Sequence, residues 1–335
     1  MRDLKAGVPV EPSKRSVAGF LIGWLNEVVD PSGRKPKTKA FYRFNVERYL
    51  VPTIGNVRLD RLSRRDVQLL IAGLGQRGKG PRTIQAVHST LRAALCEAVK
   101  RRLLADNPAQ DVEVPRPTRD PAVVHAVGRE ACEVLLRAAP GERLGEMFVL
   151  MLMLGLRKGE VLALRWSRID FEQRTLVVDS TAQRHPGVGM VIQTSTKTGR
   201  VVVHALAPSC IEALRVRRAR QAEERLRAGA AWNDLDLVFS TLFGAVLDEK
   251  VPNVLMNRVL AEAGLPSERV HNLRHTSGTA AGQVAGGDLH VVKNHLGHAS
   301  ITTTVDMYQH VLPESRRRLA DALDEHFNGG LRERA

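Results

Sequence analysis

One segment near the C-terminus gathers side chains that could bind and attack a phosphate diester. Residues 269–311 spell RVHNLRHTSGTAAGQVAGGDLHVVKNHLGHASITTTVDMYQHV. The cationic, imidazole and phenolic groups in this segment include His271, Arg274, His275, His298 and Tyr308. Guanidinium groups bind phosphate oxygens in pairs, and a phenol can act as a nucleophile when it is activated. Because carboxylates are scarce here, the mixture suits a phosphate diester better than a metal ion.

Two motifs could indicate other chemistry, but their context does not support them. GLGQRGKG at residues 73–80 fits GxGxxG and nearly fits the phosphate-binding loop GxxxxGK[ST], with Gly80 in place of Ser or Thr. Both motifs need a preceding strand, whereas a helical pattern precedes this one, so we predict a glycine-rich helix C-terminus. His271 and His275 have the spacing of zinc ligands, but the sequence has no HExxH and no third ligand at metal spacing. We therefore expect neither a bound cofactor nor a metal ion.

Four segments follow one another in a diagnostic order. They are GLRKGEVLALRW at 155–166, the turn TSTKTGR around Lys197, HNLRHT at 271–276 and LGHASITTTVDMYQHV at 296–311. Together they resemble the tyrosine recombinase family, the phage integrase type, which has its catalytic lysine in such a turn. The resemblance covers nearly all of residues 16–320 and is weaker in the first domain.

The resemblance implies that Tyr308 attacks the scissile phosphorus, forming a 3′-phosphotyrosine and leaving a 5′-hydroxyl. A phenol with an ordinary pKa of ~10 is mostly neutral at pH 7, so Tyr308 needs a nearby cation or base. Arg157 and Arg274 would hold the non-bridging oxygens, because a guanidinium bonds them bidentately and keeps its charge.

The remaining roles also come from the resemblance. Lys197 would protonate the departing 5′-oxygen. His271 would accept a proton or donate to the phosphate, and His298 would hydrogen-bond a phosphate oxygen. Glu160 would orient Arg157 or a histidine. Asn272 stands where the family commonly has Asp, which would weaken a capping or histidine-orienting role there.

Each residue taken alone has an ordinary structural alternative. Arg157 could be a surface arginine at a helix turn, and Lys197 a solvated turn lysine. Tyr308 could pack its ring in the core, and Glu160 could be an i,i+4 partner of a cation. The joint occurrence of the set favours catalysis.

The charge of the chain indicates a polyanionic partner. Lys and Arg number 50 against 36 Asp and Glu, which gives a net charge of +14 over 335 residues. Such an excess is typical of proteins that bind nucleic acid. Three widely spaced cysteines without CxxC, and an N-terminus without an apolar core, predict a reduced, cytoplasmic protein that does not enter a membrane.

The composition along the chain predicts two domains. Residues 1–15 form a polar leader, and 16–110 form a basic, all-helical domain that resembles the family's core DNA-binding domain. In this domain we expect Thr38 to cap a helix that buries Phe41 and Phe44, a capping box at Ser63 and Asp66, and an apolar helical stripe that includes Ile84, Val87 and Leu91. The segment DVEVPRPTRDP at 111–121 holds three prolines and is the expected linker. Residues 122–335 form the catalytic domain, including a tail at about 313–335. Thr38, Lys39, Arg43 and Arg82 are candidate DNA contacts, because they lie near helix starts in the basic domain.

The elements expected in the second domain give the fold class. Helical patterns dominate, but RTLVVD, GMVIQTS and RVVVHA are β-branched runs separated by glycine-containing turns. We therefore predict a mainly α protein with a small antiparallel β-sheet (α+β). The resemblance implies that its two domains close as a clamp around duplex DNA.

The resemblance predicts a site-specific DNA recombinase, or integrase, of a phage or mobile element. It would act as a homo-tetramer on double-stranded attachment sites in the bacterial nucleoid, without ATP or metal, with a directionality factor as a further possible partner. The apolar stripe of the tail could pack on its own core or dock on a neighbouring protomer, and a ring of protomers favours the neighbour. The sequence does not decide whether an arm-site-binding domain belongs before residue 16.

Two alternatives remain on the sequence alone. A type IB topoisomerase uses similar chemistry without a specific site, and a DNA-binding regulator could keep the fold without catalysis. The intact set of Arg157, Lys197, Arg274, His298 and Tyr308 argues against the regulator.

Overall fold

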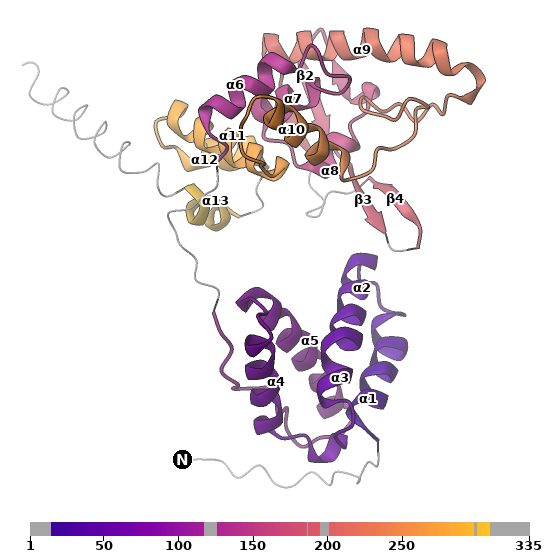
Figure 1. Cartoon of the computed structure of the whole chain (residues 1–335), viewed down its shortest axis with the longest axis vertical. Coiled ribbons are helices and arrows are strands. Elements are labelled where there is room, and N and C mark those ends of the chain that lie inside the picture. Colours follow the sequence, from indigo (N-terminus) through magenta and orange to yellow (C-terminus); the bar gives the residue numbers. More distant parts are fainter. Residues whose placement is uncertain (1–14, 117–125, 186, 195–200, 298–299, 309–335) are drawn as a thin grey trace, which may run out of the picture. The chain divides into compact units, whose positions relative to one another are not determined.

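The computed structural model describes residues 15–116, 126–185, 187–194, 201–297 and 300–308, the last range with side chains at only some positions. The chain divides into two compact units, Met1–Arg119 (unit 1) and Asp120–Ala335 (unit 2) (Figure 1). The division falls inside the proline-containing segment 111–121. Lys197, His298, most of the leader and the tail lie outside the described residues.

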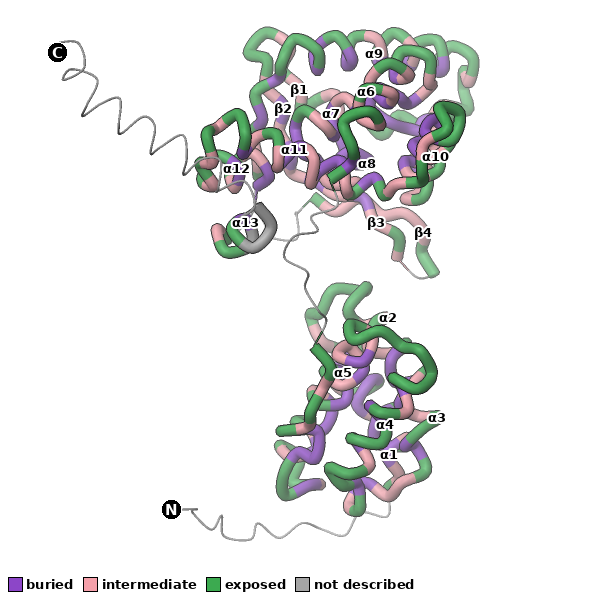
Figure 2. The backbone as a smooth tube through the Cα atoms, turned by 60° about the vertical axis from the view of Figure 1, so that its left-hand side comes forward, coloured by how far each residue is buried: buried purple, intermediate pink, exposed green. Residues whose placement is uncertain are grey.

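The described elements of unit 1 are helices, joined by turns and loops. Its helices are α1 (Val17–Trp24, continued by a π-helical turn at Leu25–Val29), α2 (Pro36–Asn45, continued by Val46–Leu50), α3 (Val51–Ile54), α4 (Arg64–Gln76) and α5 (Pro81–Lys100). The stripe predicted along α5, including Ile84, Val87 and Leu91, is buried in its core (Figure 2). The predicted capping box of Ser63 and Asp66 is present at the start of α4.

Two details of α2 differ from the sequence prediction. Thr38 does not cap this helix, which begins at Pro36 because proline suits the first helical turn. Phe41 and Phe44 do not face the core and are 46% and 55% exposed. The buried face instead includes Val46 and Leu50, and the two exposed rings pack on neighbouring tyrosines.

The GLGQRGKG segment is the C-terminal turn of α4 and the loop after it. The helix ends at Gln76, and Gly78 has a positive φ of 71°, which favours glycine. A helix therefore precedes the loop, as predicted, and the geometry required by a phosphate-binding loop is not met.

The described part of the expected linker packs on unit 1. Val112 and Val114 contact its core. The side chains of Gln68 and Gln85 donate to the carbonyls of Glu113 and Pro115, at 3.3 Å each. Residues 111–116 are therefore held in place, although they contain no helix or strand.

Unit 2 surrounds α7 with further helices. They are α6 (Arg129–Ala138), α7 (Glu146–Leu154), α8 (Lys158–Leu162), α9 (Pro208–Ala228), α10 (Val251–Glu262), α11 (Val270–Val284), α12 (Leu289–Leu296) and α13 (Ile301–Tyr308). The apolar segment of α7 packs against α9 and α11, so Met147, Leu150 and Met151 are fully buried. No helix in the described ranges is both long and apolar enough to cross a membrane.

The strands of unit 2 form two antiparallel sheets instead of one. They are β1 (Ile169–Asp170), β2 (Thr175–Val178), β3 (Thr181–His185), β4 (Gly189–Gln193) and β5 (Val202–Ala205). β1, β2 and β5 make one sheet, whereas β4 pairs with β3, a strand that was not predicted from the sequence. The segment with Lys197 thus connects two sheets. The α+β fold class is confirmed.

A buried ion pair within α9 carries the arginine that bonds this helix to the rest of unit 2. Arg217 is fully buried and donates to both carboxylate oxygens of Glu224 at 3.0 and 2.7 Å. It also donates to the carbonyls of Val238 and Arg143. Burial alone would raise the pKa of Glu224, but Arg217 and Arg143 outweigh it and lower that pKa.

We expect Arg217→Met to destabilise the protein by about 3 kcal/mol, because it leaves the buried carboxylate of Glu224 without its main partner. Denaturant unfolding of the full chain measures this. Arg215→Met changes an exposed arginine on the same helix and should stay within about 0.5 kcal/mol of wild type. Equal effects of the two substitutions would contradict the prediction.

Candidate active site

Arg274 is the buried centre of the site. It lies in the second turn of α11, is 4% exposed, and donates to the carbonyls of Gly155 and Leu296. Gly155 caps the C-terminus of α7, and Leu296 is the last residue of α12. Carbonyls at helix C-termini lack intrahelical partners and bear partial negative charge. The guanidinium therefore satisfies two helix ends at once.

Gly155 allows these elements to approach one another. Its φ of 62° is left-handed, and an added Cβ would come within 2.5 Å of the Leu296 side chain. Glycine meets both demands because it has no side chain. The chain then turns directly into Arg157, so the position of this arginine depends on the same contact.

Arg157 and Glu160 form a hydrogen-bonded pair, which is the first of the two arrangements that the resemblance implies for Glu160. Arg157 precedes α8, and its backbone N–H donates to Glu160 Oε2 at 2.8 Å while its Nη1 donates to Oε1 at 2.7 Å. The Arg157 side chain is 43% exposed, whereas that of Glu160 is 8% exposed. A buried carboxylate thus holds an arginine that remains accessible to a ligand.

His271 lies near both arginines, one turn before Arg274 on α11. The residue as a whole is exposed, but its imidazole ring is partly desolvated by neighbouring protein atoms. This desolvation lowers the pKa of His271, and the charges of Arg274 and Arg157 lower that pKa further. Its imidazole is therefore neutral at pH 7 and can accept a proton. The ring also contacts that of His275 edge-on, with centroids 5.0 Å apart.

Asn272 does not cap α11. Its side-chain amide donates to Glu268 Oε2 at 2.9 Å, so it links the first turn of the helix to the preceding loop. Arg269 occupies the N-cap position, without a side-chain capping bond.

The three other predicted catalytic residues are only partly covered by the structure. Lys197 and His298 are outside the described residues. Tyr308 is the last residue of α13, and its side chain is likewise not described. The helix itself packs against α11 and α12, which brings its backbone to the elements that hold Arg274 (Figure 1).

The candidate DNA contacts in unit 1 differ in their present partners. Thr38 and Arg82 are exposed near the starts of α2 and α5. Arg43 is paired with Asp30 at 2.7 Å and with Glu47 at 3.4 Å, and Lys39 donates to the carbonyl of Asp30. DNA contact by Arg43 would therefore compete with two carboxylates.

Three polar residues beside Arg274 were missed by the sequence analysis. Ser277 Oγ lies 2.9 Å from His295 Nε2, and the ring of His204 on β5 meets His295 edge-on with centroids 6.3 Å apart. Burial lowers the pKa of His204 to about 4, with a further contribution from His295. A histidine in a β-branched run gives no sequence signal of such a contact.

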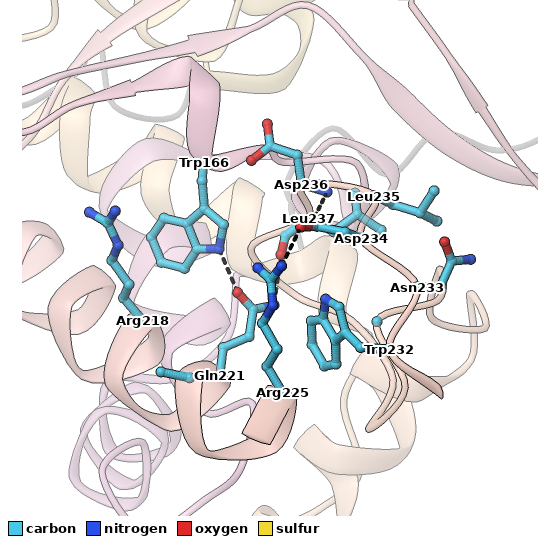
Figure 3. Close-up of a pocket in the computed structure, with 12 residues that line it drawn as sticks. Trp166, Arg218, Gln221, Arg225, Trp232, Asn233, Asp234, Leu235, Asp236 and Leu237 are labelled. Carbon is cyan, nitrogen blue, oxygen red and sulfur yellow. Dashed lines mark hydrogen bonds and ion pairs between the residues drawn. The ribbon is translucent and has the colours of Figure 1, made fainter. Parts of the chain in front are cut away.

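A separate pocket of about 300 Å³ lies between α9 and the loop at 232–237 (Figure 3). Trp166 donates to Gln221 Oε1 at 2.6 Å, and Gln221 donates to the carbonyl of Leu237 at 2.8 Å. None of the described catalytic candidates lines this pocket. Within the described part of the chain, no three His, Cys, Asp or Glu residues are grouped to hold a metal ion.

Comparisons with known proteins agree on one family. The model of the phage integrase family matches residues 129–315. A tyrosine recombinase XerC-like protein of Caldanaerobacter subterraneus subsp. tengcongensis is 28% identical, over 98% of this chain and 87% of that protein. An integrase of Saccharopolyspora erythraea is 27% identical, over 94% of this chain and 83% of that protein.

Solved structures share the fold. The Tn1549 transposon integrase in complex with transposon right end DNA has a TM-score of 0.76 and 19% identity, covering 92% of this chain and 99% of that one. A lambda integrase dimer bound to a COC′ core site has a TM-score of 0.61 and 17% identity, covering 87% and 95%.

The depressed pKa of His204 predicts a loss of stability in acid. Above pH 6.5 the folded and unfolded chains both hold this residue neutral. As pH falls from 6.5 towards 4, the unfolded chain binds a proton that the folded chain does not. This difference costs about 2 kcal/mol of folding free energy at pH 5.

Denaturant unfolding at pH 7.5 and pH 5 should therefore show a smaller acid loss for His204→Gln than for wild type. Comparing the pH difference within each protein removes the packing cost of the substitution itself. Identical acid losses in the two proteins would contradict the assignment.

Proposed function

The chain belongs to the phage integrase family and is a tyrosine recombinase, and from that premise we propose that Tyr308 cleaves DNA at specific attachment sites. The phenolic oxygen attacks the phosphorus, and the bond to the 5′-oxygen breaks. The products are a 3′-phosphotyrosine and a free 5′-hydroxyl. Attack by a 5′-hydroxyl of another strand reverses the step and exchanges the strands. The ester bond is conserved throughout, so rejoining needs no ATP.

The observation that supports this proposal most strongly is the convergence of Arg157, Arg274 and His271. Attack on a phosphate diester adds negative charge to the non-bridging oxygens in the transition state. Two fixed guanidinium groups stabilise that charge without having to reorganise. A neutral imidazole beside them can accept the phenol proton of Tyr308.

Lys197 and His298 complete the proposed site. Lys197 would give a proton to the departing 5′-oxygen, because an alkoxide is a poor leaving group. His298 would donate to a phosphate oxygen. His298 directly follows Gly297, which ends α12 in a left-handed conformation and therefore turns the chain at that point.

We also propose the partners. Double-stranded DNA fits the net charge of +14. A solved lambda integrase tetramer bound to a Holliday junction shares the fold, with a TM-score of 0.62 at 16% identity. Four copies of this chain would act together on two DNA sites. In each copy, unit 1 would be the core DNA-binding domain and unit 2 the catalytic domain. The reaction would take place in the cytoplasm at the nucleoid, with a directionality factor as a further partner.

A trapping experiment tests the nucleophile. A binding site is first selected from a pool of random duplexes, and a nick is placed beside the cleavage point so that the short 5′-hydroxyl strand diffuses away. Wild type should accumulate a covalent protein–DNA adduct on a denaturing gel, and Tyr308→Phe should accumulate none. An adduct that persists in Tyr308→Phe would refute the assignment, and relaxation of any supercoiled plasmid without the site would favour a topoisomerase.

The two arginines should respond differently to the same substitution. Arg157→Lys should lower the cleavage rate by about 10²-fold with little change in melting temperature, because the side chain is half exposed. Arg274→Lys should lower both the cleavage rate and the melting temperature, since one ammonium cannot reproduce the guanidinium geometry between two helix ends. Single-turnover cleavage and thermal unfolding measure the two effects. An unchanged melting temperature for Arg274→Lys would show that its carbonyl bonds contribute little.

A further inference from the structure

Ser277 and His295 lie directly behind the proposed catalytic arginine. Ser277 follows Arg274 on α11, where residues three apart are neighbours on the helix surface. His295 immediately precedes Leu296, whose carbonyl accepts from Arg274. Ser277 is 4% exposed, and its hydroxyl lies 2.9 Å from His295 Nε2. The pair therefore joins α11 to the last turn of α12.

The same pair also supports the second acceptor of Arg274. A Cβ at Gly155 would come within 3.2 Å of Ser277 Oγ and 3.5 Å of His295 Nε2. The serine and the histidine thus pack directly against Gly155, whose carbonyl also accepts from Arg274. The hydrogen bond between Ser277 and His295 therefore lies next to both residues whose carbonyls accept from Arg274.

β5 also contacts the C-terminal end of α12, where His295 lies. The ring of His204 stands at 90° to that of His295, and Val202 approaches Gly297 so closely that an added Cβ would lie 2.9 Å from its side chain. β5 follows the segment that contains Lys197, and Gly297 precedes His298. The elements that lead to these two proposed catalytic residues therefore meet at His295.

The charges around the pair favour a neutral imidazole. Burial lowers the pKa of His295, and the charge of Arg274 lowers it further. His204 is likewise neutral, although Glu160 acts in the opposite direction. A neutral imidazole has one donor and one acceptor nitrogen, so it can hold a single defined bond to a hydroxyl. A cationic ring would instead repel Arg274.

We propose that Ser277 and His295 are positioning residues for strand cleavage, which act by fixing the two carbonyls that orient Arg274 and the chain leading to His298. This inference rests on the proposed function. It predicts a defect in the cleavage step, and not in DNA binding or folding, when the bond between the two side chains is removed.

The experiment uses the full chain and the nicked substrate. Ser277→Ala and His295→Leu should each slow adduct formation about tenfold, the effect expected for loss of one buried hydrogen bond. The double variant should be no slower than either single one, because both remove the same bond. His295→Gln, which can still bond to Ser277, should recover to within about threefold of wild type.

Thr279→Val is the matched control. Its buried hydroxyl is on the same helix and has no hydrogen-bond partner among the described residues, so its cleavage rate should match wild type. DNA dissociation constants should stay within about twofold throughout, and melting temperatures within about 3 °C.

Three results would overturn the inference while leaving the proposed function intact. They are wild-type cleavage by Ser277→Ala, a loss of cleavage that tracks a loss of DNA binding or melting temperature, and no recovery in His295→Gln relative to His295→Leu. An adduct in Tyr308→Phe, or none with wild type, would instead refute the proposed function and the inference with it.

Discussion

The proposed active site depends on the buried guanidinium of Arg274. Removing a cation from water costs several kcal/mol unless hydrogen bonds of good geometry compensate. The compensation here comes from the carbonyls of Gly155 and Leu296, at the C-terminal ends of α7 and α12. These carbonyls would otherwise lack partners themselves. The bonds therefore stabilise the fold, and they also fix the direction of the arginine that we assign to the phosphate.

This arrangement limits what the surrounding chain can be. Residue 155 must adopt a left-handed backbone conformation and must lack a side chain for α7, α11 and α12 to pack together. Gly297 meets the same two demands against Val202 on β5. Each glycine stands just before a proposed phosphate ligand, Arg157 and His298 respectively. The turns at the two glycines therefore determine the positions of Arg157 and His298. The same close packing that requires glycine also positions the proposed phosphate ligands.

The resemblance to the family indicated the residues of the proposed site, and local spacing explains which of them are neighbours. Arg157 with Glu160, and His271 with Arg274, are pairs three residues apart, and the helical period brings such pairs together. The sequence could not show that β5 pairs with β2 instead of β4, because that pairing depends on contacts between distant segments. Nor did it reveal β3, which lacks an apolar pattern. Ser277, His204 and His295 were missed because nothing local distinguishes a buried polar residue from an exposed one. Phe41 and Phe44 show the converse error, since apolar character alone did not bury them.

The charge balance around Arg274 explains why the nearby imidazoles have to be neutral. Arg157 and Arg274 contribute two positive charges, and Glu160 contributes one negative charge while it holds Arg157 in place. These described groups leave an excess of one positive charge, to which the protonated Lys197 of the proposed site would add a second, and this excess favours an anionic phosphate diester. A cationic His204 or His295 would stand behind Arg274, where it would repel the guanidinium without reaching the phosphate. Burial prevents this by lowering both pKa values. The positive charge is thereby concentrated on the side chains that we propose to bind the phosphate, where it would stabilise the additional charge of the transition state.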